Sequence, residues 1–321
     1  MHTVVTVTLN PCVDKTAVID RLMPYELNRV RESRVDPAGK GINVAHILQS
    51  AGVDVLACGF IAGQQGEYIL EATRKEDIPT DFLKVAGETR VNLKLLDASV
   101  QKITEINEPG FFVPAESVDL FLSRFDSLTK GVSLVVLSGS LPPGVPDTVY
   151  RDCIRIARGN GARAILDADG GAFARGVEAR PFAVKPNTRE LERLVGRSLD
   201  SLPAVYTAAC GLIEKGTKLV IVSMGGDGAL IMDENQAFRA QPWAVEVKSP
   251  TGAGDSMVAA LAFALLRGMP LESVARLSTA AGSFTASLPG TTLCRMEDAA
   301  RFAEKVKITP FAGETAAEGR G

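Results

Sequence analysis

The sequence has few cysteines, and none of them lie close together. Their number is odd, and no Cys-x-x-Cys pair occurs. Disulfide frameworks and structural zinc sites need paired or closely spaced cysteines, so the sequence argues against both and suits a reducing compartment. We therefore expect a cytoplasmic protein. The cysteines are Cys12, Cys58, Cys153, Cys210 and Cys294.

A long hydrophobic run and an excess of one charge are also missing. The longest apolar run, residues 258–266, has about half the length that a membrane-spanning helix needs. Residues 1–9 are apolar but carry no charged leader and no small-residue cleavage site, which argues against a signal peptide. The 35 Lys and Arg nearly balance the 38 Asp and Glu, so no basic field would attract nucleic acid or anionic lipid. We expect no nucleic acid and no membrane as partners.

The chain does have a regular alternation of strand-like and helix-like segments. Short apolar runs at residues 134–137, 164–166, 182–185 and 219–223 are separated by segments with helical periodicity. This alternation predicts an α/β fold, a parallel sheet between helices with ligands at the carboxyl ends of the strands. With 321 residues, we expect a single domain over residues 1–311 and a disordered tail at 312–321.

Two regions interrupt the alternation. Residues 15–37 contain short extended pieces without a helical period, and residues 90–96 and 102–106 have the pattern of a hairpin. Together they predict a small β-sheet appendage made of about residues 12–37 and 89–108.

The strongest chemical signal lies where a small-residue loop enters an apolar helix. Thr251, Gly252, Ala253, Gly254 and Asp255 directly precede the apolar run. Small residues at a helix start let backbone N–H groups approach an anion closely, and the helix dipole adds to the attraction. A carboxylate beside a phosphate would repel it unless it accepted a proton from an attacking hydroxyl. The plainer alternative is that Asp255 only stabilises the helix N-terminus.

A second glycine-rich segment also precedes a helix. Gly39, Lys40, Gly41 and Asn43 combine bare backbone with a cation and an amide, which suits a polyhydroxyl or phosphorylated ligand. The alternative is a loop with a glycine helix start. Val44 stands where the dinucleotide-binding fingerprint needs a third small residue, and no P-loop motif occurs. A nicotinamide oxidoreductase and a P-loop ATPase are therefore disfavoured.

Three further segments follow predicted strands. Ser138 begins a turn at a strand end, where open α/β sheets bind ligands, although this composition is common in turns. Asn187 and Glu190, three residues apart, suit a hydrated Mg²⁺ held through water, or plain helix capping. Residues 223–228 offer bare backbone to a nucleotide, or form a hairpin turn.

Taken in this order, the motifs resemble those of the ribokinase-like family of sugar kinases, in its phosphofructokinase-B branch. The resemblance runs from Thr6 to about Lys305. Within the branch, the chain is most similar to the 1-phosphofructokinases, followed by tagatose-6-phosphate kinases and minor 6-phosphofructokinases. This ranking depends on Thr8-Leu9-Asn10-Pro11 with Asp14, on Leu27-Asn28-Arg29-Val30, on residues 89–94 (TRVNLK) and on residues 104–110 (TEINEPG).

The resemblance implies a ribokinase-like three-layer sandwich whose small β sheet acts as a lid and as the contact of a homodimer. It implies Asp255 as the catalytic base, with Gly252, Ala253 and Gly254 as the anion hole. The implied substrate-binding residues are Asp14, Arg29, Gly39, Lys40, Asn43, Arg90 and Ser138, with Arg29 reaching across a dimer interface. The implied nucleotide-binding residues are Lys185, Asn187, Ser223, Gly225, Gly226, Gly228 and Thr251, and Asn187 and Glu190 would hold the metal through water.

The implied reaction is ATP-dependent phosphorylation of fructose 1-phosphate at its 6-hydroxyl, with Mg²⁺ and, as a further candidate, K⁺. Phosphorylation of tagatose 6-phosphate or fructose 6-phosphate at the 1-hydroxyl is the alternative. A non-catalytic sugar-phosphate sensor on the same scaffold is the alternative from another class. The chain departs from the family pattern at Ala38, where glycine is usual, and at Asp169, where serine is usual.

Overall fold

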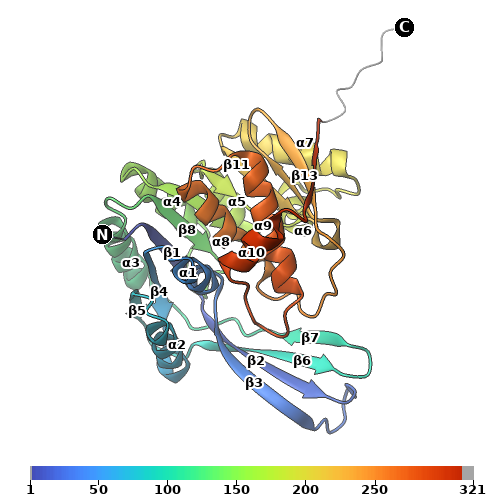
Figure 1. The fold of residues 1–321 in the computed structure, drawn as a ribbon. Coiled ribbons are helices and arrows are strands. Elements are labelled where there is room, and N and C mark those ends of the chain that lie inside the picture. The colour runs from blue at the N-terminus through green and yellow to red at the C-terminus, as the bar shows by residue number, and fades with distance from the viewer. Residues whose placement is uncertain (1, 313–321) are drawn as a thin grey trace.

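The computed structural model describes residues 2–312, and its largest element is a ten-stranded sheet (Figure 1). The strand order is β14-β13-β12-β11-β10-β9-β8-β1-β4-β5. Seven strands are parallel: β1 (Val4–Thr8), β4 (Val55–Ile61), β5 (Thr80–Lys84), β8 (Leu134–Ser138), β9 (Arg163–Asp167), β10 (Ala183–Val184) and β11 (Leu219–Ser223). The antiparallel edge consists of β12 (Ala229–Met232), β13 (Ala237–Gln241) and β14 (Lys307–Pro310).

The central strands are continuous runs of buried, mostly β-branched residues. In β1 (VVTVT) and β8 (LVVLS) every residue is buried. Such runs are typical of parallel strands that are covered on both faces, since alternating polar residues would place polar groups under a helix layer.

Helices cover both faces of this sheet. One face is covered by α1 (Lys40–Ser50), α8 (Ala253–Leu266), α9 (Leu271–Ala286) and α10 (Met296–Ala303). The other face is covered by α3 (Ala115–Leu128), α4 (Val149–Gly159), α5 (Gly170–Val177), α6 (Thr188–Val195) and α7 (Leu202–Glu214). Helix α8 is apolar almost all round and is buried, as expected for a core helix. The predicted three-layer α/β sandwich is confirmed.

A second, four-stranded sheet projects from the body beside α2 (Gly63–Lys75) (Figure 1). Its order is β3 (Val30–Ala38), β2 (Cys12–Ile19), β6 (Arg90–Asp97) and β7 (Lys102–Ile106). Strands β2 and β6 are parallel, and Cys12, Asp14 and Thr16 pair with Arg90, Asn92 and Lys94. Because side chains alternate along a strand, these six share one face of the sheet. We refer to this four-stranded sheet as the lid.

Four elements carry no clear signal in the sequence. These are β5, α5, α10 and β14, which are short or lie at a sheet edge, where the hydrophobic period is hard to read. Within residues 2–312, no helix has both the length and the apolar character needed to cross a membrane. The predicted disordered tail lies, beyond residue 312, outside the described residues.

Candidate active site

A polar cavity of about 440 Å³ opens between the lid and the carboxyl ends of β1, β8 and β9. Residues from the lid, from the start of α1 and from the start of α8 meet in its wall. Those used below are Asn10, Asp14, Gly39, Lys40, Asn43, Arg90, Asn92, Lys94, Ser140, Asp169, Glu190, Thr251 and Asp255. Ala38 and Asp169, the two positions at which the chain departs from the family pattern, both line it.

Asp255 lies in the first turn of α8, where it is only 7% exposed. Its Oδ2 accepts a hydrogen bond of 2.7 Å from Asn43 Nδ2 of α1. Burial raises the pKa of Asp255, while the positive charge of Lys40 and the Asn43 hydrogen bond act in the opposite direction. A carboxylate with a raised pKa is a stronger base, so Asp255 is well suited to accept a proton.

Two glycines let the starts of α8 and α1 pack closely against neighbouring segments of the chain. Gly252, the residue before α8, has a φ of +78°, and a Cβ there would lie 2.5 Å from Leu293 Cδ2. A Cβ on Gly41 would lie 2.6 Å from the carbonyl oxygen of Val7 in β1. Real Cβ atoms do not approach backbone so closely, so α1 can sit against β1 only with glycine at this position.

Asp167, at the carboxyl end of β9, joins two lysines. Its Oδ2 lies 3.2 Å from Lys40 Nζ, and its Oδ1 lies 3.1 Å from Lys185 Nζ. Burial raises the pKa of Asp167, but the charges of Lys185 and Lys40 outweigh it and hold the pKa below its usual range. Lys185 Nζ also lies 3.3 Å from the point where a Cβ on Gly254 would be. The start of α8 is therefore flanked by a fixed cation.

On the lid side, Arg90 is held with its guanidinium facing the cavity. Its Nη1 donates to the Glu108 carbonyl at 3.1 Å, and its Nη2 donates to the Asn10 carbonyl at 3.1 Å. Nη2 also lies 3.4 Å from Ser140 Oγ, and the buried Nε has no hydrogen-bond partner. A guanidinium fixed at the wall of a cavity is well suited to bind a phosphate.

Two predicted substrate residues do not reach this cavity. Ser138 is the last residue of β8 and is fully buried; after the turn at Gly139 (φ +101°), it is Ser140 that lines the cavity. Ser140 rather than Ser138 therefore lines the cavity, and the role of Ser138 near the sugar's phosphate stays a prediction. Arg29 lies in the exposed segment before β3 and does not line the cavity in this chain.

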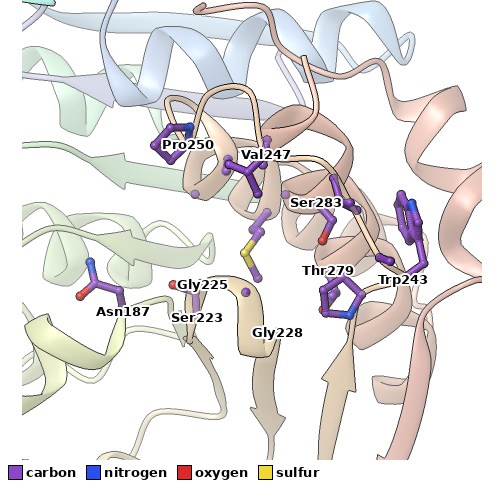
Figure 2. Close-up of a pocket in the computed structure, with 18 residues that line it drawn as sticks. Asn187, Ser223, Gly225, Gly228, Trp243, Val247, Pro250, Thr279 and Ser283 are labelled. Atoms are coloured by element: carbon purple, nitrogen blue, oxygen red, sulfur yellow. The ribbon is translucent and has the colours of Figure 1, made fainter. Parts of the chain in front are cut away.

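A second cavity of about 650 Å³ lies on the other side of the start of α8 (Figure 2). The predicted nucleotide residues Asn187, Ser223, Gly225, Gly226 and Gly228 line it. Lys185 and Thr251, also predicted to bind the nucleotide, do not line this cavity. The Lys185 ammonium pairs with Asp167, and Thr251 lines the polar cavity. The 3-10 turn η1 (Gly225–Asp227) presents the glycine backbone to this cavity.

The two cavities meet at adjacent residues. Ala253 and Gly254 line the larger cavity, whereas Asp255 lines the polar cavity. The first turn of α8 therefore separates them, with Ala253 and Gly254 on one side and the Asp255 carboxylate on the other.

The segment predicted to hold a metal forms a capping box at the start of α6. Asn187 Oδ1 accepts the Glu190 N–H at 2.9 Å, and Glu190 Oε2 accepts the Asn187 N–H at 2.8 Å. The helix cap that the sequence offered as the alternative to a metal site is therefore present. Glu190 nevertheless lines the polar cavity, and burial raises its pKa despite the nearby charges of Lys185 and Lys40. Among residues 2–312, no cluster of three or more His, Cys, Asp or Glu forms a site for a directly bound metal.

Several cavity residues escaped the sequence reasoning. Asn92 and Lys94 follow Arg90 at every second position of an expected strand, and this period of two was a usable signal. Trp243, Thr279 and Ser283 line the larger cavity from a loop and from α9, and no local motif marks them (Figure 2).

Residues 7–299 match the family described as pfkB family carbohydrate kinase. The chain belongs to this family. It is 40% identical to the 1-phosphofructokinase of Xanthomonas campestris pv. campestris over 312 residues, covering 95% of this chain and 93% of the relative. It is 37% identical to the 1-phosphofructokinase of Bacillus subtilis over 281 residues, covering 88% and 91%.

The pfkB fold is also shared with solved structures. Phosphofructokinase-2 from Escherichia coli in complex with potassium superposes with a TM-score of 0.89 at 30% identity, covering 95% of this chain and 99% of that one. The cavity pair described above therefore lies in a pfkB carbohydrate kinase, a class that transfers a phosphoryl group from a nucleotide to a carbohydrate.

Proposed function

We propose that the protein transfers the γ-phosphoryl group of ATP to the 6-hydroxyl of fructose 1-phosphate, forming fructose 1,6-bisphosphate and ADP. The observation that carries this proposal is the position of Gly254 and Asp255. These adjacent residues face the larger and the polar cavity respectively. ATP in the first and a sugar in the second would meet at the start of α8.

The sugar is proposed from the lid and from the relatives' names. Arg90 offers a fixed guanidinium to a phosphate already on the sugar, which favours a sugar phosphate over a free sugar. The relatives from X. campestris and B. subtilis are named 1-phosphofructokinases. Escherichia coli phosphofructokinase-2 has been solved with fructose-6-phosphate, so fructose 6-phosphate and tagatose 6-phosphate remain the alternatives.

In the proposed reaction, Asp255 accepts the proton of the attacking hydroxyl while Asn43 holds its carboxylate in place. Asp14 accepts hydrogen bonds from the sugar's hydroxyls. The backbone of residues 252–254 and the ammonium groups of Lys185 and Lys40 face the transferred phosphoryl group. Fixed donors at this point stabilise the charge that develops during transfer.

We propose Mg²⁺ as the divalent ion. Without a direct-ligand cluster in residues 2–312, the donor set fits an ion held mainly by nucleotide oxygens and water, which Mg²⁺ prefers. Glu190, whose carboxylate lines the polar cavity, would contact that hydrated ion, with Asn187 across the capping box. When bound, Mg²⁺ would neutralise charge on the transferred phosphate. We extend the proposal to K⁺ because E. coli phosphofructokinase-2 was solved with potassium.

We further propose a homodimer formed through the lid. Large apolar side chains are exposed on the lid and its connecting loop, and Arg29 lies in the same segment, where it could reach a partner's cavity. These side chains are Met23, Tyr25, Leu27, Val30, Val35 and Ile106. Phosphofructokinase-2 of E. coli has been solved in a tetrameric form. Light scattering of wild type and of Tyr25→Ser/Leu27→Ser tests this proposal: a dimer that the double substitution dissociates supports it, and a wild-type monomer contradicts it.

We propose a cytoplasmic location because the cysteines form no disulfides. All five are free, which fits a reducing compartment.

The reaction is tested by ADP release with Mg-ATP across fructose 1-phosphate, fructose 6-phosphate, tagatose 6-phosphate, fructose and ribose. We expect the highest kcat/KM with fructose 1-phosphate. A maximum with either 6-phosphate keeps the mechanism but refutes the assigned substrate. Sugar-phosphate binding without ADP release from any of the five would refute the kinase and favour the sensor.

A further inference from the structure

Lys94 is a buried lysine at the edge of the polar cavity, in which we propose that the sugar binds. It lies on β6 and its side chain is 7% exposed, which is unusual because lysine is almost never buried without a partner. Its Nζ donates to Asp14 Oδ2 at 2.5 Å and to Thr251 Oγ1 at 3.4 Å. One ammonium thus contacts both the lid and the loop that leads into α8.

The first contact fixes the orientation of Asp14. Besides Lys94, the Asp14 carboxylate accepts a long hydrogen bond of 3.4 Å from Asn92 Nδ2 and a contact of 3.6 Å from Cys12 Sγ, both at Oδ1. Asp14 is 5% exposed, and its partners come from β2 and β6. The lid therefore holds this carboxylate in one position relative to the cavity.

The second contact reaches the phosphoryl-transfer side. Thr251 immediately precedes Gly252, which has a left-handed conformation and begins the turn into α8. A shift of Thr251 would move the first turn of α8, which carries Asp255. Lys94 thus contacts both Asp14, whose carboxylate lines the polar cavity, and Thr251, which lies 157 residues after Lys94 and next to the first turn of α8.

We propose that Lys94 is a positioning residue that aligns Asp14 of the lid with the anion-binding turn of α8. The ammonium replaces water as the partner of Asp14 and keeps Thr251 against the lid. The sugar's hydroxyls and the transferred phosphoryl group are then placed relative to each other before reaction, which is where precise positioning contributes most to rate. This inference rests on the proposed kinase function.

The test compares Lys94→Met and Lys94→Arg with a matched control, Lys15→Met. Lys15 lies on the neighbouring strand β2 but is exposed. Initial rates are measured against both substrates, using the panel sugar that the wild type phosphorylates best. Lys94→Met should lower kcat and raise the KM for the sugar, with kcat/KM at least about tenfold below that of Lys15→Met, as expected for a lost charged hydrogen bond. The KM for ATP should stay within about threefold, since Lys94 does not line the nucleotide cavity.

A merely structural role predicts a different result. Loss of folded protein would reduce the active fraction but leave the sugar KM of the remaining enzyme unchanged, and that outcome overturns the proposal. Lys94→Arg keeps a charge beside Asp14 and should recover part of the sugar KM. An arginine variant with the same sugar KM as Lys94→Met also overturns it.

Removal of Lys94 leaves the Asp14 charge buried without its partner, so Lys94→Met has a route to misfolding. The double variant Asp14→Asn/Lys94→Met avoids this because it buries neither charge, and it is compared with Asp14→Asn, which retains Lys94. The double variant should have a kcat at saturating sugar at least about threefold below that of Asp14→Asn, because Asp14→Asn retains the contact between Lys94 and Thr251. Equal kcat values refute that connection. A wild type inactive on all five sugars refutes the proposed function instead, whereas an active wild type with an unaffected Lys94→Met refutes only the role of Lys94.

Discussion

Replacement of Asp167 by asparagine should destabilise the protein strongly. Asp167 is 1% exposed, and its two carboxylate oxygens pair with Lys40 and Lys185. Asparagine has nearly the same shape, so the substitution removes the charge without creating a cavity. Both ammonium groups would then remain in the site without their counter-charge.

The size of the effect follows from the burial of the two lysines. Removal of one partner from a buried ion pair costs about 3–5 kcal/mol. The Lys185 side chain is 4% exposed and should incur this cost in full, whereas Lys40 is 37% exposed and stays partly hydrated, so it adds little. We expect Asp167→Asn to lower the free energy of unfolding by about 3–5 kcal/mol in total.

Equilibrium urea unfolding at neutral pH measures this difference. Glu234→Gln is the matched control, because it removes one charge from a surface pair in which both side chains are 58% exposed, and it should cost less than about 1 kcal/mol. A loss for Asp167→Asn no larger than that of the control would refute the reasoning.

The pH dependence of the free energy of unfolding gives a second check on the ion pairs of Asp167. Burial raises the pKa of Asp167, but Lys185 and Lys40 hold it below its ordinary range. The native state therefore binds the proton less readily than the unfolded chain does. The advantage of wild type over Asp167→Asn should be complete above about pH 4 and should shrink as the pH falls further.

Four other predictions concern the site. Asp255→Asn keeps an acceptor for Asn43 Nδ2 and should fold normally, yet lose at least about 10²-fold in kcat; normal turnover would exclude Asp255 as the base. Because burial raises the pKa of Asp255 and the base must be ionised, wild-type kcat/KM should fall with decreasing pH at a pKa above the ordinary aspartate value, about 3.9, and a fall only below that value contradicts this. Arg90→Ala should weaken sugar-phosphate binding by about 1.5–3 kcal/mol and leave the KM for ATP unchanged; the reverse pattern argues against the placement of Arg90. Trp243, the only tryptophan, lines the larger cavity and stacks on Phe302 with ring centroids 5.1 Å apart, so its fluorescence should change on titration with ADP but not with the sugar phosphate alone.

The parts of the site that are contiguous in sequence could be predicted. Residues 252–254 and Asp255 occupy neighbouring positions at one helix start, and Gly39, Gly41, Lys40 and Asn43 occupy another. At such positions the local backbone alone creates the binding chemistry, because the first N–H groups of a helix have no partner within it.

The parts that depend on orientation could not be predicted. Ser138 and Ser140 are equally plausible in sequence, and the turn at Gly139 decides which one faces the cavity. Similarly, Pro250 lines the larger cavity, whereas Thr251, the next residue of the same loop, lines the polar cavity. A rotation of one residue along an irregular loop reverses which cavity a side chain faces, and no periodicity encodes it.

The sequence by itself determined the alternation of elements, the apolar core and the two helix starts, since each depends on interactions between near neighbours in the chain. Only the tertiary structure decided which charges meet. Asn43 contacts Asp255 across 212 residues, and Lys40 contacts Asp167 across 127. These contacts exist because parallel strands bring their carboxyl ends to one edge of the sheet, where side chains from distant segments share a site in which Asp167 and Asp255 are buried. In that setting the pKa of each carboxyl group is set by burial and by partners that its own sequence neighbours do not reveal.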